Sequence, residues 1–245
     1  YLITSLIIKE LYSTNNFSFL IFYERRIRRL IPTLLLVIFA CIPISWFYLL
    51  PGDLEDFSKS ILFTLAFVSN YFFHYSGLDY FDIDGLYKPL LHTWSLSIEE
   101  QYYIIFPILL VLLFKFLKNK IFFVLITLFV LNLLLVQFSG NLKFNYPFIE
   151  NISDLKFNAP SVYFYKFYFI TSRFWELLAG SLIVFFEIKY KAKHINQDHN
   201  TGQILSVLGI LMIVCPIYFY DSNIYHPSIF TFIPVLGTCL IIWHS

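Results

Sequence analysis

Residues 89–107 read PLLHTWSLSIEEQYYIIFP, a polar segment that runs directly into a long apolar one. The polar half, from His92 to Gln101, holds an imidazole, an indole, two serines, two adjacent carboxylates and an amide. A charged side chain near the centre of a bilayer costs about 2.5–3.5 kcal/mol, so membrane proteins keep such groups where they have partners or a task. We therefore expect a functional site here, at the start of a membrane helix.

The composition is that of a membrane protein. Hydrophobic residues make up 58% of the 245 positions, whereas soluble domains are about 45–50% apolar. The net charge of +1 gives no field that would attract nucleic acid. The cysteines and histidines have no metal-ligand spacing. We expect the lipid bilayer as a partner, and neither nucleic acid nor a metal.

The apolar runs predict an all-α, polytopic transmembrane helix bundle. They are too long and too continuous for the alternating strands of an outer-membrane barrel. About six or seven of them are expected to cross the bilayer. The runs cover residues 1–8, 30–50, 58–75, 102–117, 121–138, 163–186, 203–220 and 229–244.

Three basic segments constrain the topology: ERRIRR (24–29), KFLKNK (115–120) and KYKAKH (189–194). The positive-inside rule places all three in the cytoplasm, so an even number of crossings must separate each pair. Three candidate runs lie between the first two segments, so one of them cannot cross. The short run 58–75, which contains Asn70 and His74, is the one we expect to be re-entrant. The segment PGDLED (51–56) before it is predicted to be a turn on the outer side.

The two adjacent glutamates have different explanations. Ser97 and Glu100 fit a capping box, with Ser97 as the N-cap of the helix. That arrangement does not explain Glu99, because neighbouring side chains on a helix point about 100° apart. Glu99 can take part in proton transfer, or it can orient an imidazole or an arginine.

The other candidate residues also have a structural alternative. His92 can be a structural histidine, and Trp94 can be an interfacial anchor of the aromatic belt. Arg173 and Glu176 are spaced to pair on one helix face, either as a membrane-buried salt bridge or in catalysis. The arginines at 25–29 can serve topology alone or also a binding site.

Four segments, in this order, resemble the acyltransferase-3 family of polytopic O-acyltransferases, and most of all its branch that modifies lipopolysaccharide or peptidoglycan. They are FYERRIRRLIP, YF followed by PLLHTWSLSIEEQYYIIFP, SRFWELLAG and FIPVLGTCLIIW, which together extend over nearly the whole chain. The resemblance implies that Arg26 and Arg29 handle the acyl-CoA donor. The catalytic candidates are His92, Trp94, Ser95, Glu99, Glu100, Arg173 and Glu176.

The implied protein is a multi-pass O-acyltransferase of the bacterial inner membrane. It would move an acyl group, expected to be acetyl, from cytoplasmic acyl-CoA to a hydroxyl of an envelope glycan. Residues 1–245 would form part of the family's transmembrane domain, without the first helix and its histidine base and without the C-terminal part, and would be inactive alone. A transporter or flippase for an envelope precursor remains the alternative, and a non-catalytic envelope scaffold is a third.

Overall fold

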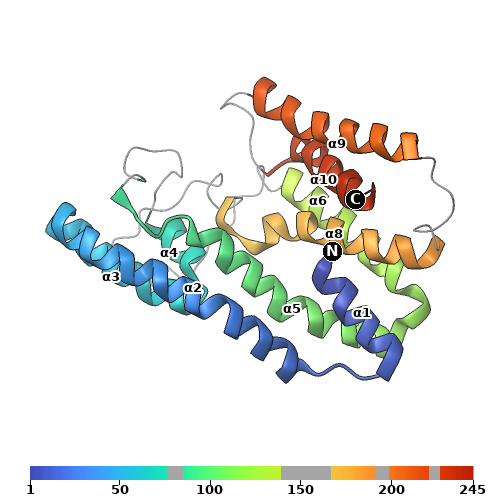
Figure 1. The fold of residues 1–245 in the computed structure, drawn as a ribbon, viewed down its shortest axis with the longest axis horizontal. Coiled ribbons are helices and arrows are strands. Elements are labelled where there is room, and N and C mark those ends of the chain that lie inside the picture. Colours follow the sequence, from blue (N-terminus) through green and yellow to red (C-terminus); the bar gives the residue numbers. More distant parts are fainter. Residues whose placement is uncertain (77–84, 86, 139–166, 191–198, 221–226, 245) are drawn as a thin grey trace. The chain divides into compact units, whose positions relative to one another are not determined.

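A computed structural model describes residues 1–76, 85, 87–138, 167–190, 199–220 and 227–244. All regular elements in these ranges are helices (Figure 1). They are α1 (Leu2–Thr14), α2 (Phe19–Tyr48), α3 (Pro51–Leu65), α4 (Ser69–Tyr75), α5 (Thr93–Leu117), η2 (Lys118–Lys120), α6 (Ile121–Phe138), α8 (Ile170–Tyr190), α9 (His199–Phe219), η5 (Ile229–Thr231) and α10 (Phe232–His244).

The chain is an all-α membrane helix bundle, as predicted. Within the described ranges, three helical stretches are long and apolar enough to cross a membrane, namely Phe19–Tyr48, Thr93–Phe138 and Thr201–Phe219, and Ile229–His244 is a shorter apolar one. At 1.5 Å per residue α2 is about 45 Å long, more than the roughly 30 Å of a hydrocarbon core. Large apolar side chains such as Phe47 are exposed along it, as lipid contact requires.

The chain forms two compact units. One comprises Thr14–Ile104 and Tyr146–Phe169, and the other comprises Tyr1–Ser13, Ile105–Asn145 and Ile170–Ser245. The division falls within α5, so this helix contributes its polar first half to one unit and its apolar second half to the other.

The run 58–75, expected not to cross, is interrupted. Helix α3 ends at Leu65 and α4 begins at Ser69. Between them, Phe67 has a φ of 54°, a left-handed conformation that is uncommon for a bulky residue. With 15 residues, α3 extends about 22 Å, too short for a full crossing. Its re-entry into the bilayer stays a prediction.

Two sequence predictions on helix boundaries are wrong. The segment PGDLED is no turn but the beginning of α3, with Pro51 in the first turn and Asp53 close behind. Proline is favoured at the first helical position and an acid near a helix N-terminus is stabilising, so these residues also fit a helix start. Similarly, α1 was expected to end before Lys9 and Glu10 but continues to Thr14.

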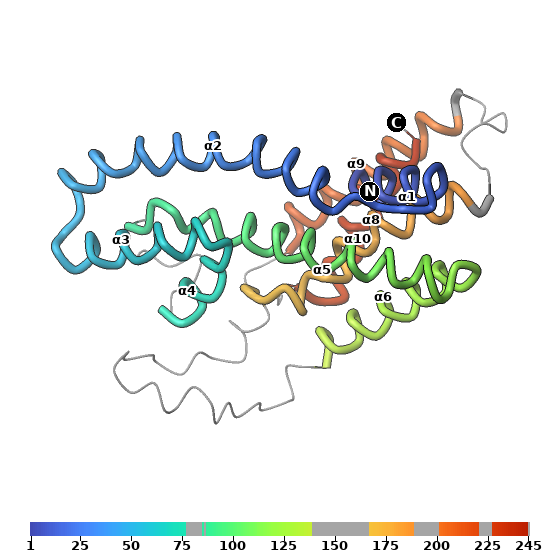
Figure 2. The backbone as a smooth tube through the Cα atoms, turned by 90° about the horizontal axis from the view of Figure 1, so that it is seen from below, coloured from blue at the N-terminus to red at the C-terminus, as the bar shows by residue number. Residues whose placement is uncertain are grey.

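In the unit that contains the C-terminal half of α5, the chain turns at η2 and enters α6 (Figure 2). The predicted limits of α6, 121–138, are confirmed. Helix α6 packs mainly against α8, and α9 packs mainly against α10. The α9–α10 crossing occurs at Gly209 and Gly237. A Cβ atom on Gly209 would lie 2.7 Å from the carbonyl oxygen of Gly237, so only glycine permits this approach.

Candidate functional site

An ion pair between Arg26 of α2 and Glu100 of α5 joins two of the segments singled out by the sequence. Arg26 Nε lies 2.8 Å and 2.9 Å from the two carboxylate oxygens, and Nη2 lies 2.6 Å from Oε1. The side chains are 21% and 10% exposed. A forked guanidinium–carboxylate contact of this kind is among the strongest hydrogen-bonded arrangements in proteins.

The Arg26 guanidinium also stacks on an aromatic ring. Its central carbon lies 3.4 Å from the ring centroid of Tyr103, three residues after Glu100. The hydroxyl of Tyr23 donates to the main-chain carbonyl of Tyr103 at 3.2 Å. Carboxylate and ring therefore fix the guanidinium plane together, and α2 is attached to α5 by side chains from both helices.

The predicted capping box is wrong. Helix α5 begins at Thr93, so Ser97 lies inside the helix and cannot be its N-cap. The Ser97 hydroxyl instead lies 2.8 Å from that of Ser69 and accepts the Ser69 N–H at 3.2 Å. The Thr93 hydroxyl lies 3.0 Å from those of Ser69 and Thr64. All four side chains are buried, so the hydroxyls satisfy one another.

One turn further along α5, Gln101 continues this buried polar face. Its Nε2 donates to the carbonyl of Phe67 at 3.0 Å and to Oδ1 of Asn70 at 2.9 Å. Asn70 in turn donates to the carbonyl of Tyr168 at 3.0 Å. The sequence prediction missed Ser69, Asn70 and Gln101 as a group, although the spacing of Thr93, Ser97 and Gln101 places them on one helix face.

His92, Ser95 and Glu99 lie on the opposite, exposed side of the segment, which we call the exposed stripe. Their spacing of three and four residues is that of one helix face. The Ser95 hydroxyl donates to the His92 carbonyl at 3.1 Å, so the stripe lies at the start of α5. Polar and ionisable groups in a membrane helix face protein or a water-filled cavity, so we expect such a cavity beside the stripe.

Trp94 belongs to the core. It is 7% exposed, and its ring lies 4.7 Å from that of Phe167 and 5.4 Å from that of Tyr168, between centroids. The alternative of an interfacial anchor is therefore wrong, because an anchor presents its ring to the headgroups. Trp94 fixes the start of α5 and does not line the exposed stripe.

Arg29 and the Arg173–Glu176 pair complete the candidate residues. Arg29 is exposed on α2. Arg173 Nη1 lies 3.4 Å from Glu176 Oε2, which confirms that these residues pair on one face of α8. Arg173 and Glu176 belong to the other compact unit.

The described part of the chain contains no group of three or more His, Cys, Asp or Glu side chains arranged to hold a metal ion. Cys41, Cys215 and Cys239 are free thiols.

Comparison with known proteins adds relatives over all or part of the chain. An uncharacterized protein of Haemophilus influenzae is 34% identical over 247 residues, which cover 99% of this chain and 93% of that protein. An O-acetyltransferase OatA of Staphylococcus aureus is 35% identical over 135 residues, 55% of this chain and 22% of that protein. A peptidoglycan O-acetyltransferase OatA of Listeria monocytogenes is 35% identical over 119 residues, 49% of this chain and 19% of that protein.

The chain thus matches only about a fifth of the length of these OatA proteins. No protein-family model matches it, and no solved structure matches it. The chain belongs to the same family as the Haemophilus influenzae protein and is related, over about half its length, to O-acetyltransferases.

Proposed function

We propose that this protein is an O-acetyltransferase of the acyltransferase-3 type in the bacterial inner membrane. It transfers acetyl from cytoplasmic acetyl-CoA to a hydroxyl of a cell-envelope glycan. The names of the partial relatives support the reaction class, and one of those names specifies peptidoglycan. Whether the acceptor is peptidoglycan or lipopolysaccharide is decided by the experiment below.

The Arg26–Glu100 pair is the observation that supports this function most strongly. It joins the arginine segment expected to handle the donor to the segment expected to carry catalysis, within two helices apolar enough to cross a membrane. A charged pair in such surroundings is costly, and most intramembrane ionisable groups mark a functional path.

The transfer forms an ester bond between the acceptor oxygen and the acetyl carbonyl carbon, and it breaks the thioester carbon–sulfur bond. The acceptor's hydroxyl proton passes to a base, and the leaving sulfur takes up a proton. His92 and Glu99 are the titratable groups of the exposed stripe, where an acceptor hydroxyl can approach. Arg29 is suited to the donor's phosphates, since a guanidinium binds phosphate through two parallel hydrogen bonds.

The first test is acetyl transfer in membranes that contain the full-length protein. Acetyl-CoA labelled in the acetyl group is supplied on the cytoplasmic side, and envelope glycans are then analysed by mass spectrometry. We expect label on a sugar hydroxyl, and its loss in Glu100→Gln. Movement of an envelope precursor across the membrane without acetyl transfer would instead establish the transporter alternative.

The second test addresses the donor. Arg26→Lys combined with Arg29→Lys keeps the positive charges and therefore the topology signal, but it removes the planar fork that Arg26 uses on Glu100 and that Arg29 can use on phosphate. We expect acetyl transfer to fall and the KM for acetyl-CoA to rise. An unchanged dependence on acetyl-CoA concentration would limit these arginines to topology.

A further inference from the structure

Asn132 lies near the middle of α6, in the sequence IFFVLITLFVLNLLLVQF. An amide side chain in an apolar membrane helix is unfavourable unless its donor and acceptor are both bonded, and such amides commonly join neighbouring helices. Asn132 was not among the residues predicted to form the site. Its hydrogen-bond partners show which part of the fold it holds in place.

Both polar atoms of Asn132 bond to the backbone of α8. Nδ2 donates to the Thr171 carbonyl at 2.7 Å, and Oδ1 accepts the Trp175 N–H at 3.0 Å. Residues 171 and 175 are the two that a regular α-helix bonds to each other, four positions apart. One side chain from α6 therefore holds one complete turn of α8.

That turn carries the predicted Arg173, and Glu176 follows it directly. The Trp175 indole is fully buried, and its ring packs against those of Phe129 and Phe232 from α6 and α10. Tryptophan packing and the Asn132 amide together set the rotation of α8 about its axis. This rotation decides where the Arg173 and Glu176 side chains point.

We infer that Asn132 is a positioning residue for acetyl transfer, which acts by fixing the α8 turn that presents Arg173 and Glu176. It does not touch substrate. The inference rests on the proposed function and on the sequence prediction that Arg173 and Glu176 take part in catalysis.

Asn132→Leu tests the inference directly, because leucine has nearly the same shape as asparagine but makes no hydrogen bond. We expect kcat for acetyl transfer to fall about 10- to 100-fold, the range that a misplacement of about 1 Å can cause. The KM for acetyl-CoA should change less than about twofold, since a misplaced catalytic pair affects the reaction step more than donor binding.

Asn132→Asp provides a second readout. An ionised carboxylate still accepts the Trp175 N–H but cannot donate to the Thr171 carbonyl, whereas the protonated acid can do both. Activity relative to the parent protein should therefore be low at high pH and recover as pH falls through the pKa of the introduced acid. A role in packing alone would give the pH profile of the parent.

Thr127→Val is the matched control. Thr127 lies on the same helix, and its hydroxyl bonds to the Phe123 carbonyl within α6, so its removal should leave acetyl transfer unchanged. Every rate is normalised to the amount of folded protein, measured by size-exclusion chromatography of a fluorescent fusion. Glu176→Gln is the reference for the site itself and should be inactive.

These variants separate the two levels of the proposal. An active Asn132→Leu beside an inactive Glu176→Gln overturns the positioning role and leaves the proposed function standing. Full activity of Glu176→Gln removes the pair from the site, and the inference fails with it. If loss of folded protein accounts for the whole effect of Asn132→Leu, and Asn132→Asp keeps the parent's pH profile, Asn132 is only structural and the inference is overturned.

Discussion

At the scale of single residues, Arg26 is held by the Glu100 carboxylate and by the Tyr103 ring. The Glu100 carboxylate accepts hydrogen bonds from two of the Arg26 nitrogens, and the Tyr103 ring covers the guanidinium plane. Tyr23 joins the same two helices through its hydrogen bond to the Tyr103 carbonyl. Burying a charge pair costs desolvation free energy. Removing only one partner is the most destabilising change, because it leaves the other charge buried and unpaired. Arg26 and Glu100 should therefore be more sensitive to single substitutions than to an exchange of both.

This argument gives the first prediction. Arg26→Glu or Glu100→Arg alone should destabilise the detergent-solubilised protein by about 3–5 kcal/mol, because each leaves two like charges facing each other in a buried place. The double exchange should recover a substantial part of that loss. The measurement is thermal unfolding followed by fluorescence-detected size-exclusion chromatography.

The control is Arg28→Glu. Arg28 pairs with Glu24 in the same segment, but the two side chains are 79% and 47% exposed, and exposed pairs contribute little. Its stability should stay close to that of the parent. Equal destabilisation by Arg28→Glu and Arg26→Glu would contradict a special role for the buried pair.

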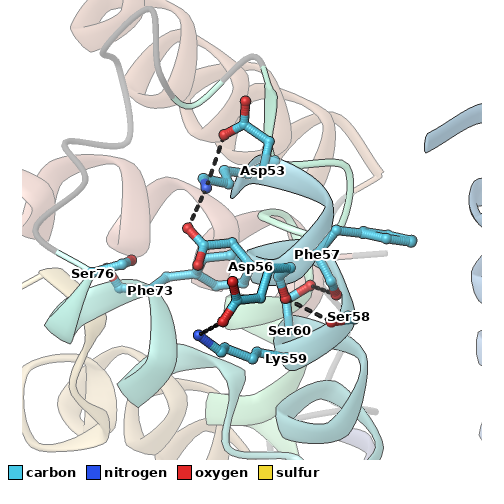
Figure 3. Close-up of polar contacts among 10 residues, drawn as sticks. Asp53, Asp56, Phe57, Ser58, Lys59, Ser60, Phe73 and Ser76 are labelled. Atoms are coloured by element: carbon cyan, nitrogen blue, oxygen red, sulfur yellow. Dashed lines mark hydrogen bonds and ion pairs between the residues drawn. The ribbon is translucent and has the colours of Figure 1, made fainter. Parts of the chain in front are cut away.

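At the scale of secondary-structure elements, Lys88 connects α3 to the segment that enters α5. Its Nζ lies 2.8 Å from Asp56 Oδ2 and 3.5 Å from Asp53 Oδ1, and its side chain is 9% exposed. Figure 3 shows Asp53 and Asp56 both turned toward one nitrogen atom, and Lys59 forms a separate pair with Glu55. Lys88 thus anchors the chain four residues before His92.

The second prediction compares these two lysines. Lys88→Met should cost about 1.5–3 kcal/mol of stability, the range for hydrogen bonds to charged groups, and it should also reduce acetyl transfer because the exposed stripe loses its anchor. Lys59→Met removes an exposed pair with Glu55 and should change neither quantity. The pair of variants is compared in one thermal-unfolding series and one transfer assay. Indistinguishable results for Lys88→Met and Lys59→Met would rule out the anchor.

The helix α9–α10 crossing carries the third prediction. Gly209 and Gly237 bring the two backbones close enough that a Cβ on either would lie under 3 Å from the other's carbonyl oxygen. Close backbone approach at small residues is a main source of packing between membrane helices. Gly209→Ala should therefore push the helices apart and lower the unfolding temperature, and Gly237→Ala should act alike.

Gly202 on the same helix serves as the control, because a Cβ there would meet only the His244 ring at 3.9 Å. Gly202→Ala should be neutral or slightly stabilising, since alanine favours a helix by about 1 kcal/mol over glycine. Disulfide trapping between cysteines placed beside each glycine would report the separation directly. Unchanged trapping in Gly209→Ala would contradict the tight crossing.

The sequence predicted the helices themselves better than the residues at which they begin and end. The limits of α6 follow directly from an uninterrupted apolar run, and 121–138 was predicted without error. The start of α5 was placed too late, because Ser97 and Glu100 satisfy a local capping pattern while the partners they bond in the fold are distant in sequence. Arg26 and Glu100 were each predicted as site residues, but their pairing depends on how α2 packs against α5, which no local pattern encodes.

At the scale of the whole molecule, the expected topology would link the proposed chemistry to the two sides of the membrane. Counting α2 and α5 as crossings and α3–α4 as a non-crossing element gives the even number that the first two basic segments require. Glu100 nevertheless lies about 25 Å along α5 from its lysine-rich C-terminal end. Arg26, bonded to Glu100, is therefore expected to lie below the cytoplasmic surface, within the bilayer.

The fourth prediction tests this depth with single cysteines, after Cys41, Cys215 and Cys239 are replaced by serine. In right-side-out spheroplasts, Glu55→Cys at the start of α3 should react with a membrane-impermeant maleimide, and Asn119→Cys in the η2 turn should react only once the cytoplasmic side is opened. Arg29→Cys, one turn beyond Arg26, should react from the cytoplasmic side with a small thiosulfonate and poorly with a bulky maleimide. Asn119→Cys labelling in intact spheroplasts would reverse the topology. Equal bulky labelling of Arg29→Cys and Asn119→Cys would place the arginines at the surface, where they could contact the donor's phosphates directly.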